Sequence, residues 1–349
     1  MLTKPRIIKG NSARRTPSTM VALEVVSSVE ALPETKTLKR GIYVPVLTFF
    51  TGEHGAVLDL EAFEKHIAYV ATSGVAGIVA LGSTGEAVSL TDDEKVTLVR
   101  STRKAMNACG CSDMPLIAGA GGHSVVTARA SLAAMASAGA SHALVLPSSY
   151  YPNQLGAPAA LDFYTAIADS SPIPILIYSY PGVCSGINLS SDVTRKLSHH
   201  PRIRGVKHTD HDIGKMARNC ALPAAAGDGV HFFVLGGASD YLIGALAVGA
   251  HGTITGMGNI APRAVVQLQR LFDQGRHPEA TELQHIVSLA EWELGKGGVP
   301  MHKALVDSFH GYGGLPRAPL QPSPKETVQQ AVTAFHRLMQ VEQELAKST

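Results

Sequence analysis

Short apolar runs alternate along the middle of the chain with longer segments in which apolar residues recur at helical spacing. The runs are rich in valine, isoleucine and leucine, a composition typical of parallel strands that are buried on both faces of a sheet. Eight such runs lie at 41–50, 77–83, 115–121, 142–148, 174–181, 203–209, 231–237 and 252–256. We therefore predict eight parallel strands.

The segments between these runs are long enough to be the crossover helices that parallel pairing requires. They lie at 59–73, 91–108, 124–138, 159–169, 190–199 and 239–248, and Thr91 with Glu94 forms a capping-box motif in one of them. Eight repeated units of strand and helix predict an α/β fold, a (β/α)8 TIM barrel. An open doubly wound sheet has the same local pattern, so the pattern alone does not decide whether the sheet closes.

The two ends of the chain differ from this repeating pattern. Strand signals stop after residue 260, and helical patterns follow at 261–274, 278–294 and 324–345. The first 40 residues contain basic side chains and no acidic one before Glu24, as in a mitochondrial targeting leader, although Pro5 and Pro17 would interrupt an amphipathic helix. We expect a flexible or targeting leader at 1–40, a catalytic barrel at 41–260 and a C-terminal helical extension at 261–349.

Composition narrows the classes of protein that fit this chain. Of 349 residues, 45% are hydrophobic, which is enough to form a core and excludes wholesale disorder. The 30 lysines and arginines are interspersed with 28 acidic residues, so we expect no nucleic-acid partner. No apolar run approaches the roughly 20 residues that cross a bilayer, so we expect no membrane partner. Four cysteines without framework spacing suit a reducing compartment, so we expect an intracellular protein, with the cytoplasm favoured over the mitochondrial matrix.

In a barrel of this kind, functional groups lie at the C-terminal ends of the strands and in the loops that follow them. The second predicted strand ends in Gly82-Ser83-Thr84-Gly85-Glu86, where glycines let backbone amides approach a ligand beside two hydroxyl groups. This pattern indicates an anion-binding loop, with an ordinary strand-to-helix turn as the alternative. It lacks the spacing of a nucleotide-binding P-loop.

The sixth predicted strand carries Lys207 inside a run that should be buried, where an unpaired ammonium group is costly. Because side chains alternate along a strand, Gly205, Lys207 and Thr209 share one face, and the glycine leaves room beside the amine. Burial lowers the pKa of an amine, and a neutral amine can form a Schiff base with a ketone. The alternative is a structural lysine paired with Asp210 or Asp228.

Tyrosine hydroxyls from neighbouring strands complete the candidate site. Tyr178 lies in the fifth predicted strand, from which it could reach a substrate bound to the amine as a proton donor or base. Tyr150 and Tyr151 follow the fourth predicted strand at the barrel mouth. Packing is the alternative explanation for all three tyrosines.

Taken together, these segments resemble the dihydrodipicolinate synthase and N-acetylneuraminate lyase superfamily, the class I (Schiff-base) pyruvate aldolases, over about residues 41 to 320. Four motifs carry the resemblance in order: Gly-Ser-Thr-Gly-Glu at 82–86, Tyr150-Tyr151, Ile-Tyr-Ser-Tyr-Pro around Tyr178, and Gly-Val-Lys at 205–207. The resemblance implies a closed barrel. It also implies that Lys207 forms an imine with a small 2-oxo acid, without a metal or an organic cofactor.

The resemblance further implies a role for each site residue. Tyr178 would shuttle protons, and Ser83 and Thr84 would hold the substrate carboxylate. Thr84 would also relay protons toward a Tyr151 contributed across a subunit interface, and a homotetramer is the implied assembly. The implied catalytic residues are Lys207, Tyr178, Thr84 and Tyr151, and the implied substrate-binding residues are Ser83, Gly82, Thr209, Ile254 and Gly236.

Among members of the superfamily, the segments 41–45 and 311–320 look most like 4-hydroxy-2-oxoglutarate aldolases and fungal 2-keto-3-deoxy acid aldolases. This likeness implies that the protein cleaves or forms a 4-hydroxy-2-oxo acid, with pyruvate and an aldehyde such as glyoxylate as products. Condensation of pyruvate with aspartate semialdehyde is the alternative. However, Pro181-Gly182-Val183 lacks the arginine with which such synthases usually hold the second substrate.

Three other classes of function fit parts of the sequence less well. The segment 119–124 approaches a dinucleotide-binding fingerprint, but its third glycine is a serine and no acidic residue follows at the required distance. His208, Asp210, His211 and Asp212 could bind a metal ion, but alternation turns His208 away from Lys207. A non-catalytic barrel that binds a 2-oxo acid is a further alternative, against which the complete catalytic motifs argue.

Overall fold

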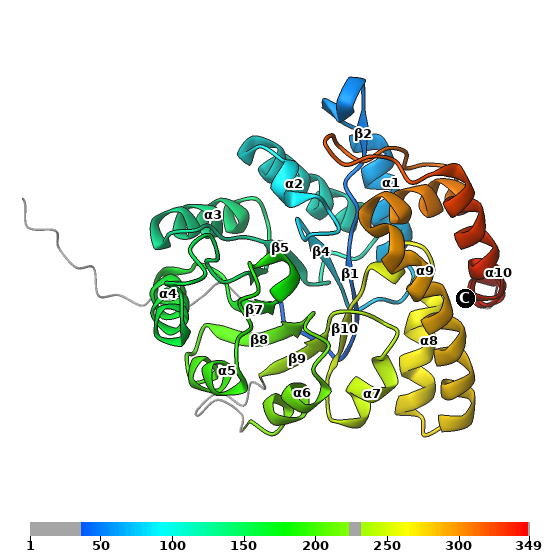
Figure 1. Cartoon of the computed structure of the whole chain (residues 1–349). Helices are drawn as coiled ribbons and strands as arrows, with labels where there is room; N and C mark the ends of the chain where they lie inside the picture. Colours follow the sequence, from blue (N-terminus) through cyan, green and yellow to red (C-terminus); the bar gives the residue numbers. More distant parts are fainter. Residues whose placement is uncertain (1–35, 223–231, 348–349) are drawn as a thin grey trace, which may run out of the picture. The chain divides into compact units, whose positions relative to one another are not determined.

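The structure is a computed structural model that describes residues 36–222 and 232–347. Within these ranges, eight parallel strands form a closed barrel in the order β1-β10-β9-β8-β7-β6-β5-β4, with helices outside it (Figure 1). The barrel strands are β1 (Gly41–Pro45), β4 (Gly77–Ala80), β5 (Leu116–Gly119), β6 (His142–Val145), β7 (Ile175–Ser179), β8 (Ile203–His208), β9 (Phe233–Gly236) and β10 (Gly252–Ile254). The predicted barrel is confirmed, and the open doubly wound sheet is wrong.

Two of the predicted strands have different bounds in the structure. β1 ends at Pro45, and the amide of Leu47 donates to the Asn259 side chain at 3.1 Å rather than to a neighbouring strand. Phe50 begins β2 (Phe50–Thr51), which pairs antiparallel with β3 (Val57–Leu58) outside the barrel. The apolar run concealed the end of the barrel strand, because residues 46–50 are buried although they lie beyond β1. β9 begins at Phe233, and the predicted start of that strand at residue 231 lies outside the described residues.

Helices follow the barrel strands with bounds close to those predicted. They are α1 (Leu60–Ala71), α2 (Asp92–Ala108), α3 (Val125–Ser137), α4 (Ala157–Ser170), α5 (Ser191–Ser198), α6 (Ile213–Cys220), α7 (Leu242–Ala247) and α8 (Pro262–Asp273). Short 3-10 helices lie at Glu53–Gly55, Ala87–Ser89, Pro181–Val183 and Gly256–Asn259. Thr91 and Glu94 form the predicted capping box of α2. α6 was not predicted, because it has only eight residues and buries the polar Lys215 and Asn219 beside the apolar Met216.

The C-terminal part of the chain is helical, as predicted. α9 (His277–His310) continues beyond the predicted end at residue 294 and bends at Gly298, whose backbone is not helical. α10 (Lys325–Lys347) follows, and α8 packs against β1 and α7 as the eighth barrel helix. The division at residue 260 stays a prediction, and the predicted leader lies almost entirely outside the described residues. In the part of the chain that the structure describes, no helix is long and apolar enough to cross a membrane.

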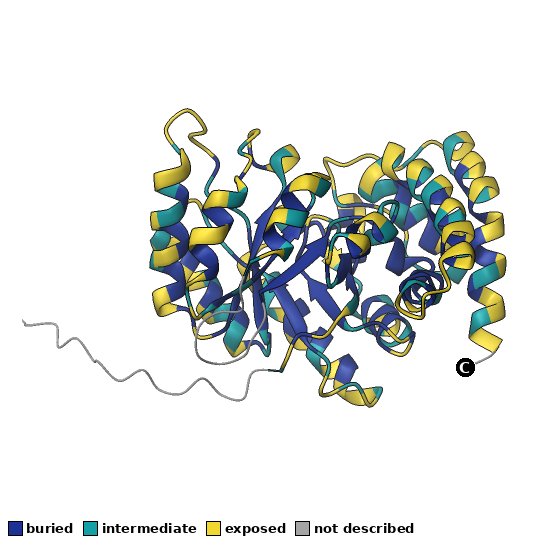
Figure 2. Ribbon diagram, turned by 90° about the horizontal axis from the view of Figure 1, so that it is seen from below, coloured by how far each residue is buried: buried dark blue, intermediate teal, exposed yellow. Residues whose placement is uncertain are grey.

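Alternate residues of the barrel strands form two apolar layers. The inner layer fills the barrel and includes Tyr43, Val79, Ile117, Leu144, Leu176, Tyr178, Leu235 and Ile254. The outer layer packs against the helices, and Figure 2 shows the buried strands surrounded by helices whose outward faces are exposed. Because the interior is packed, space for a ligand is expected only at the strand ends.

A buried histidine makes the stability of the fold depend on pH. His66 on α1 contacts Asn259 Oδ1 through Nε2 at 2.9 Å and the Tyr312 hydroxyl through Nδ1 at 3.0 Å. Burial lowers the pKa of His66 to about 4 from an ordinary value of 6.5. Between these two values the unfolded chain binds more protons than the folded one. The free energy of unfolding should therefore fall by about 2–3 kcal/mol as the pH decreases from 6.5 to 4.

Urea unfolding between pH 7.5 and 4 would measure this dependence. The His66→Gln variant should lose this part of the pH dependence. The exposed His54 provides a matched control, because the His54→Gln variant should keep the wild-type slope. Equal slopes for the wild type and His66→Gln would contradict the prediction.

Candidate active site

Lys207 and Tyr178 meet near the C-terminal ends of β8 and β7. The two residues are paired across these strands, and Lys207 Nζ donates to the Tyr178 hydroxyl at 3.1 Å. Lys207 is 5% exposed and Tyr178 is 4% exposed, so water has little access to either group. Asp210, considered above as a partner for Lys207, pairs with Lys215 instead, and Asp228 lies outside the described residues. The amine is therefore held beside a hydroxyl group inside the barrel.

Gly205 is required for a different reason from the predicted one. A Cβ atom at this position would lie 2.5 Å from the carbonyl oxygen of Phe233 on β9. The glycine thus permits the close approach of β8 and β9, rather than leaving space beside the amine. A side chain here would force β8 away from β9 and would displace Lys207 with it.

The predicted anion-binding loop, residues 82–86, follows β4. Leu81, just before the loop, and Glu86, its last residue, have left-handed backbones, at φ 59° and 54°. A Cβ atom at Gly85 would lie 2.9 Å from a carbonyl oxygen just after β1, so glycine lets the loop pack there. Within the described residues, the amides and hydroxyls of Ser83 and Thr84 have no hydrogen-bond partner. Four donors are therefore free to bind an anion such as a carboxylate.

Glu86 ties the loop to the C-terminal part of the chain. Its buried carboxylate lies 2.6 Å from Nζ of Lys303 on α9. Burial lowers the pKa of Lys303, and the charge of Glu86 opposes this shift. The Arg317 amide donates to Glu86 at 2.9 Å, and its guanidinium forms two bonds of 2.7 Å to Glu94 on α2. The segment around Arg317 thus holds the loop, although 231 positions separate Arg317 from Glu86.

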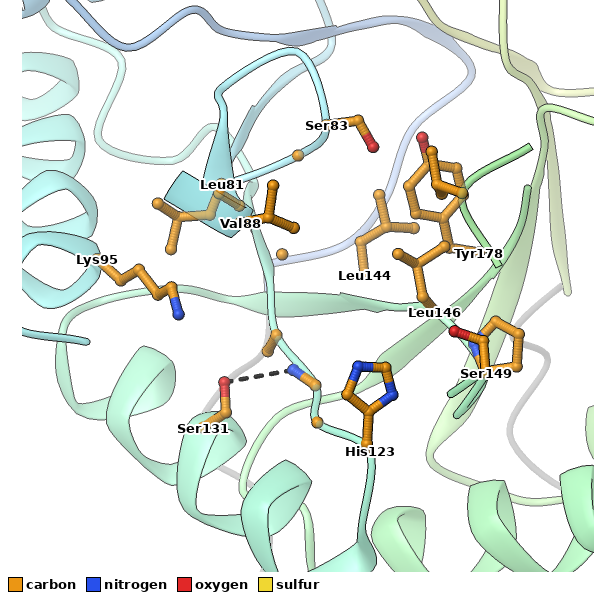
Figure 3. A pocket seen from close by; sticks show the side chains of 18 residues that line it. Leu81, Ser83, Val88, Lys95, His123, Ser131, Leu144, Leu146, Ser149 and Tyr178 are labelled. Atoms are coloured by element: carbon orange, nitrogen blue, oxygen red, sulfur yellow. Dashed lines mark hydrogen bonds between the residues drawn. The ribbon is translucent and has the colours of Figure 1, made fainter. Parts of the chain in front are cut away.

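A cavity of about 360 Å³ opens beside Tyr178 (Figure 3). Gly82 and Ser83 also line it, so three of the predicted site residues share this cavity. Sequence reasoning missed other lining residues, among them Leu81, Val88, Lys95, His123, Leu144, Leu146, Ser149 and Val183. His123 and Ser149 could have been found from their positions just after β5 and β6. The isopropyl group of Val183 lies in the wall, in the segment where an arginine was expected for the synthase alternative.

The structure brings only some of the remaining predicted site residues close to Lys207 and Tyr178. Ile254 lies in the inner barrel layer with Tyr178, and Gly236 ends β9, where it pairs with His208 of β8. The Thr209 hydroxyl is buried and has no partner among the described residues. The Tyr151 side chain is 60% exposed and packs on Tyr150, with 5.0 Å between ring centres. Within the described part of this single chain, Tyr151 makes no hydrogen bond to Thr84 or Tyr178.

The competing sites receive no support from the geometry. His208 Nδ1 donates to Asp210 at 3.1 Å, and His208 Nε2 accepts from Asn219 at 3.0 Å, so neither ring nitrogen is free to bind a metal ion. Among the described residues, no group of three or more His, Cys, Asp or Glu is arranged to hold a metal ion. The segment 119–124 follows β5 of a closed barrel rather than a strand of an open sheet.

The four thiols are free, and burial raises the pKa of Cys184 and Cys220 to about 11.

Known proteins resemble this chain over most of its length. The model of the dihydrodipicolinate synthetase family matches residues 38–337. A protein of Emericella nidulans named "Probable 4-hydroxy-2-oxoglutarate aldolase, mitochondrial" is 40% identical over 89% of this chain and 98% of its own length. The "L-threo-3-deoxy-hexylosonate aldolase" of Aspergillus niger is 35% identical over 88% of this chain and 97% of its own length. A crystal structure of a dihydrodipicolinate synthase family protein from Coccidioides immitis is 32% identical, with a TM-score of 0.79, and covers 90% of this chain and 100% of that one.

Proposed function

This chain belongs to the dihydrodipicolinate synthetase family, and we propose that it is a class I aldolase that cleaves or forms a 4-hydroxy-2-oxo acid. Its products in the cleavage direction are pyruvate and an aldehyde such as glyoxylate. The observation that carries the proposal is the buried contact of 3.1 Å between Lys207 Nζ and the Tyr178 hydroxyl. A nucleophilic amine beside a proton carrier is the pair of groups that Schiff-base aldol chemistry needs. The name of the Emericella nidulans relative supports the substrate class.

The first half of the reaction attaches the substrate to the enzyme. Lys207 Nζ, as the neutral amine, attacks the C2 carbonyl of the oxo acid and forms a carbinolamine. The Tyr178 hydroxyl gives its proton to the departing hydroxyl group, so that water leaves and a protonated imine and the Tyr178 phenolate remain. The free donors of Ser83 and Thr84 hold the C1 carboxylate, which turns C2 toward the amine. The other sides of the substrate face Gly82, Thr209, Gly236 and Ile254.

The second half breaks the carbon–carbon bond. Tyr178, as a phenolate, takes the proton of the 4-hydroxyl group, and the C3–C4 electrons move to the imine nitrogen. The aldehyde leaves, and Tyr178 gives the proton that it took to C3 of the enamine that remains. Water then hydrolyses the imine, which releases pyruvate and restores the Lys207 amine. Because the imine is the electron sink, the reaction needs neither a metal ion nor an organic cofactor.

Reductive trapping tests the proposed function. Incubation with pyruvate and borohydride should attach a reduced three-carbon adduct to Lys207, because hydride converts the imine into a stable secondary amine. Peptide mass spectrometry would locate the adduct, and Lys215, which is also buried, should stay unmodified. EDTA should leave turnover unchanged. An unmodified Lys207 together with turnover that EDTA abolishes would instead support a metal-dependent aldolase.

The alternatives have less support than the aldolase. Condensation with aspartate semialdehyde would need a cation for the second carboxylate. Val183 supplies none, and Lys95, a cation in the wall of the cavity, already pairs with Asp92 at 3.0 Å. A non-catalytic 2-oxo-acid-binding barrel would bind pyruvate without releasing it from any oxo acid. A coupled assay for pyruvate release over a panel of 4-hydroxy-2-oxo acids distinguishes these functions.

We infer a homotetramer in which Tyr151 completes the site of a neighbouring subunit. Tyr150 and Tyr151 are 70% and 60% exposed, and the Tyr150 ring centre lies 6.1 Å from that of His123, which lines the cavity. Val88, which also lines the cavity, is 99% exposed. Exposed apolar side chains that gather in this way are typical of interaction surfaces. Light scattering should therefore report a mass four times that of the chain.

Mixing two variants tests the contribution of Tyr151. Lys207→Met and Tyr151→Phe should each have little activity alone. After subunit exchange, mixed pairs regain one site that holds both native side chains, so an equal mixture should recover about a quarter of wild-type activity. If Tyr151 acted within its own chain, mixing would restore nothing.

The compartment remains a choice between the cytoplasm and the mitochondrial matrix. The Emericella nidulans relative is named as mitochondrial, which supports the matrix. Import of the full chain into isolated mitochondria, with and without residues 1–40, distinguishes the two compartments.

A further inference from the structure

A buried polar cluster lies on the outer side of β7 and β8, behind Lys207 and Tyr178. Its members, termed the Asp210 cluster, are Ser179, Asn188, His208, Asp210, Lys215 and Asn219. The Asp210 carboxylate accepts from Ser179 Oγ at 2.5 Å and from His208 Nδ1 at 3.1 Å, and lies 2.8 Å from Lys215 Nζ. The side chains of His208, Asp210 and Lys215 are at most 3% exposed. α5 and α6 lie outside the barrel beside these strands (Figure 1), and Lys215 and Asn219 belong to α6.

Almost every polar group of the cluster has a partner. Besides Asp210, the Lys215 ammonium donates to Asn188 Oδ1 at 2.5 Å and to the Leu189 carbonyl at 3.1 Å, which uses all three of its protons. Asn219 Nδ2 donates to His208 Nε2 at 3.0 Å. The Asp212 amide also donates to Asp210, at 3.2 Å. A buried network this completely bonded is rigid.

The charged groups of the cluster fix the positions of the side chains around them rather than adding net stability to the fold. Burial by itself would raise the pKa of Asp210, but hydrogen bonds from His208, Lys215 and Ser179 lower it overall, far below its ordinary value. The Asp210 carboxylate is therefore charged, and it balances the buried positive charge of Lys215. A buried ion pair is often no more stabilising than apolar residues of the same volume. The place of this ion pair in the fold therefore says more about its role than its contribution to stability does.

The Asp210 cluster joins the two strands at the level of the candidate reacting groups. Ser179 and His208 directly follow Tyr178 and Lys207 and pair with each other across the strands. Alternation turns them outward, where Asp210 bonds to both. Nearer the start of the strands, a register shift at Ile175 interrupts the β7–β8 ladder. The relative position of the strand ends therefore depends on contacts beyond that irregularity.

We propose that Asp210 is a positioning residue: by bonding Ser179 of β7 and His208 of β8, it holds the Tyr178 hydroxyl against Lys207 Nζ. The proposal rests on the proposed Schiff-base function. Misplacement of a catalytic group by about 1 Å can cost about 10²-fold in rate. Loss of one of the two bonds to the strands should therefore lower turnover without removing a group that touches the substrate.

The Ser179→Ala variant tests this proposal, because it removes only the bond from β7. We expect kcat to fall about tenfold, with KM changed less than twofold and with Lys207 still trapped by pyruvate and borohydride. The same change in a Tyr178→Phe background should lower kcat by less than twofold, since Ser179 acts through the Tyr178 hydroxyl. Equal losses in both backgrounds would overturn the proposal. An unchanged kcat per trapped site with a lowered melting temperature would do so as well.

Ser141 provides the matched control. Its hydroxyl donates to the Leu116 carbonyl at 3.1 Å and accepts from the Leu116 amide at 3.0 Å, so it also joins two neighbouring strands, but at the opposite end of the barrel. The Ser141→Ala variant should leave kcat per trapped site unchanged. A tenfold loss there would show that any broken bond between strands has this effect, and would overturn the specific role of Asp210.

A second variant tests Asp210 itself. Asp210→Asn alone would leave the Lys215 charge buried without a counterion, so the double variant Asp210→Asn/Lys215→Met keeps the charges balanced. It should show the same selective fall in kcat, and wild-type kcat would overturn the proposal. Failure of the proposed function is distinguishable, because the wild-type enzyme would then give no borohydride adduct at Lys207.

Discussion

Replacement of Lys207 by methionine should lower kcat by roughly 10⁴-fold or more, because no imine can form and the carbon–carbon bond then has no electron sink. Methionine is similar in length to lysine and is apolar, so it fits the space between Tyr178 and Leu235, which pair with Lys207 on either side. We therefore expect the fold to be kept. Pyruvate release in a coupled assay measures the loss, and thermal unfolding confirms that the protein is folded.

Lys104 provides the control for this substitution, because its side chain is 72% exposed on α2. The Lys104→Met variant should have wild-type turnover. A folded Lys207→Met variant that retained more than a few per cent of wild-type turnover would contradict the Schiff-base mechanism. Activity in that variant would also mean that the buried contact with Tyr178 has only a structural role.

The Tyr178→Phe variant should lower kcat by about 10²- to 10⁴-fold, the usual contribution of a positioned acid–base group. The ring stays in the inner barrel layer, so packing is preserved and only the hydroxyl that contacts Lys207 is lost. Imine formation depends mainly on Lys207. Borohydride should therefore still trap pyruvate on this variant, whereas cleavage of the oxo acid is slow. This separation of trapping from turnover would assign the proton transfer to Tyr178.

Tyr180 provides a matched control for the loss of a phenol. Its ring centre is 5.7 Å from that of Tyr178, and burial raises its pKa, so its hydroxyl stays protonated at neutral pH. The Tyr180→Phe variant should keep kcat within about threefold of wild type. The opposite order, with Tyr180→Phe impaired and Tyr178→Phe active, would transfer the proposed proton shuttle to Tyr180.

The elements that sequence patterns predicted well are those whose signals are local. The strand run around Lys207 and the capping box of α2 depend on residues a few positions apart, and both are present in the structure. The run from residue 41 to 50 was misjudged at its end, because residues 46–50 stay buried although β1 ends at Pro45. α6 was missed because it is only eight residues long and two of its buried positions, Lys215 and Asn219, are polar members of the Asp210 cluster.

The candidate site was predictable to a similar extent. Alternation along β8 was enough to place Lys207 inside the barrel and His208 outside it. The contact of Glu86 with Lys303 and Arg317 was not predictable, because it joins parts of the chain that are more than 200 positions apart. Gly205 was predicted to leave room beside the amine, but it instead permits the approach of a neighbouring strand, which the sequence of a single strand does not reveal.

For this protein, the amino-acid sequence by itself determined the repeated strand and helix units and the face of β8 that carries the amine, because periodicity and alternation are properties of neighbouring residues. The tertiary structure alone decided that the sheet closes, that the Tyr178 hydroxyl lies 3.1 Å from Lys207 Nζ, and that Asp210 joins the strands behind them. These features depend on how segments distant in the chain pack together, and the free energy of that packing is distributed over contacts that no local pattern contains.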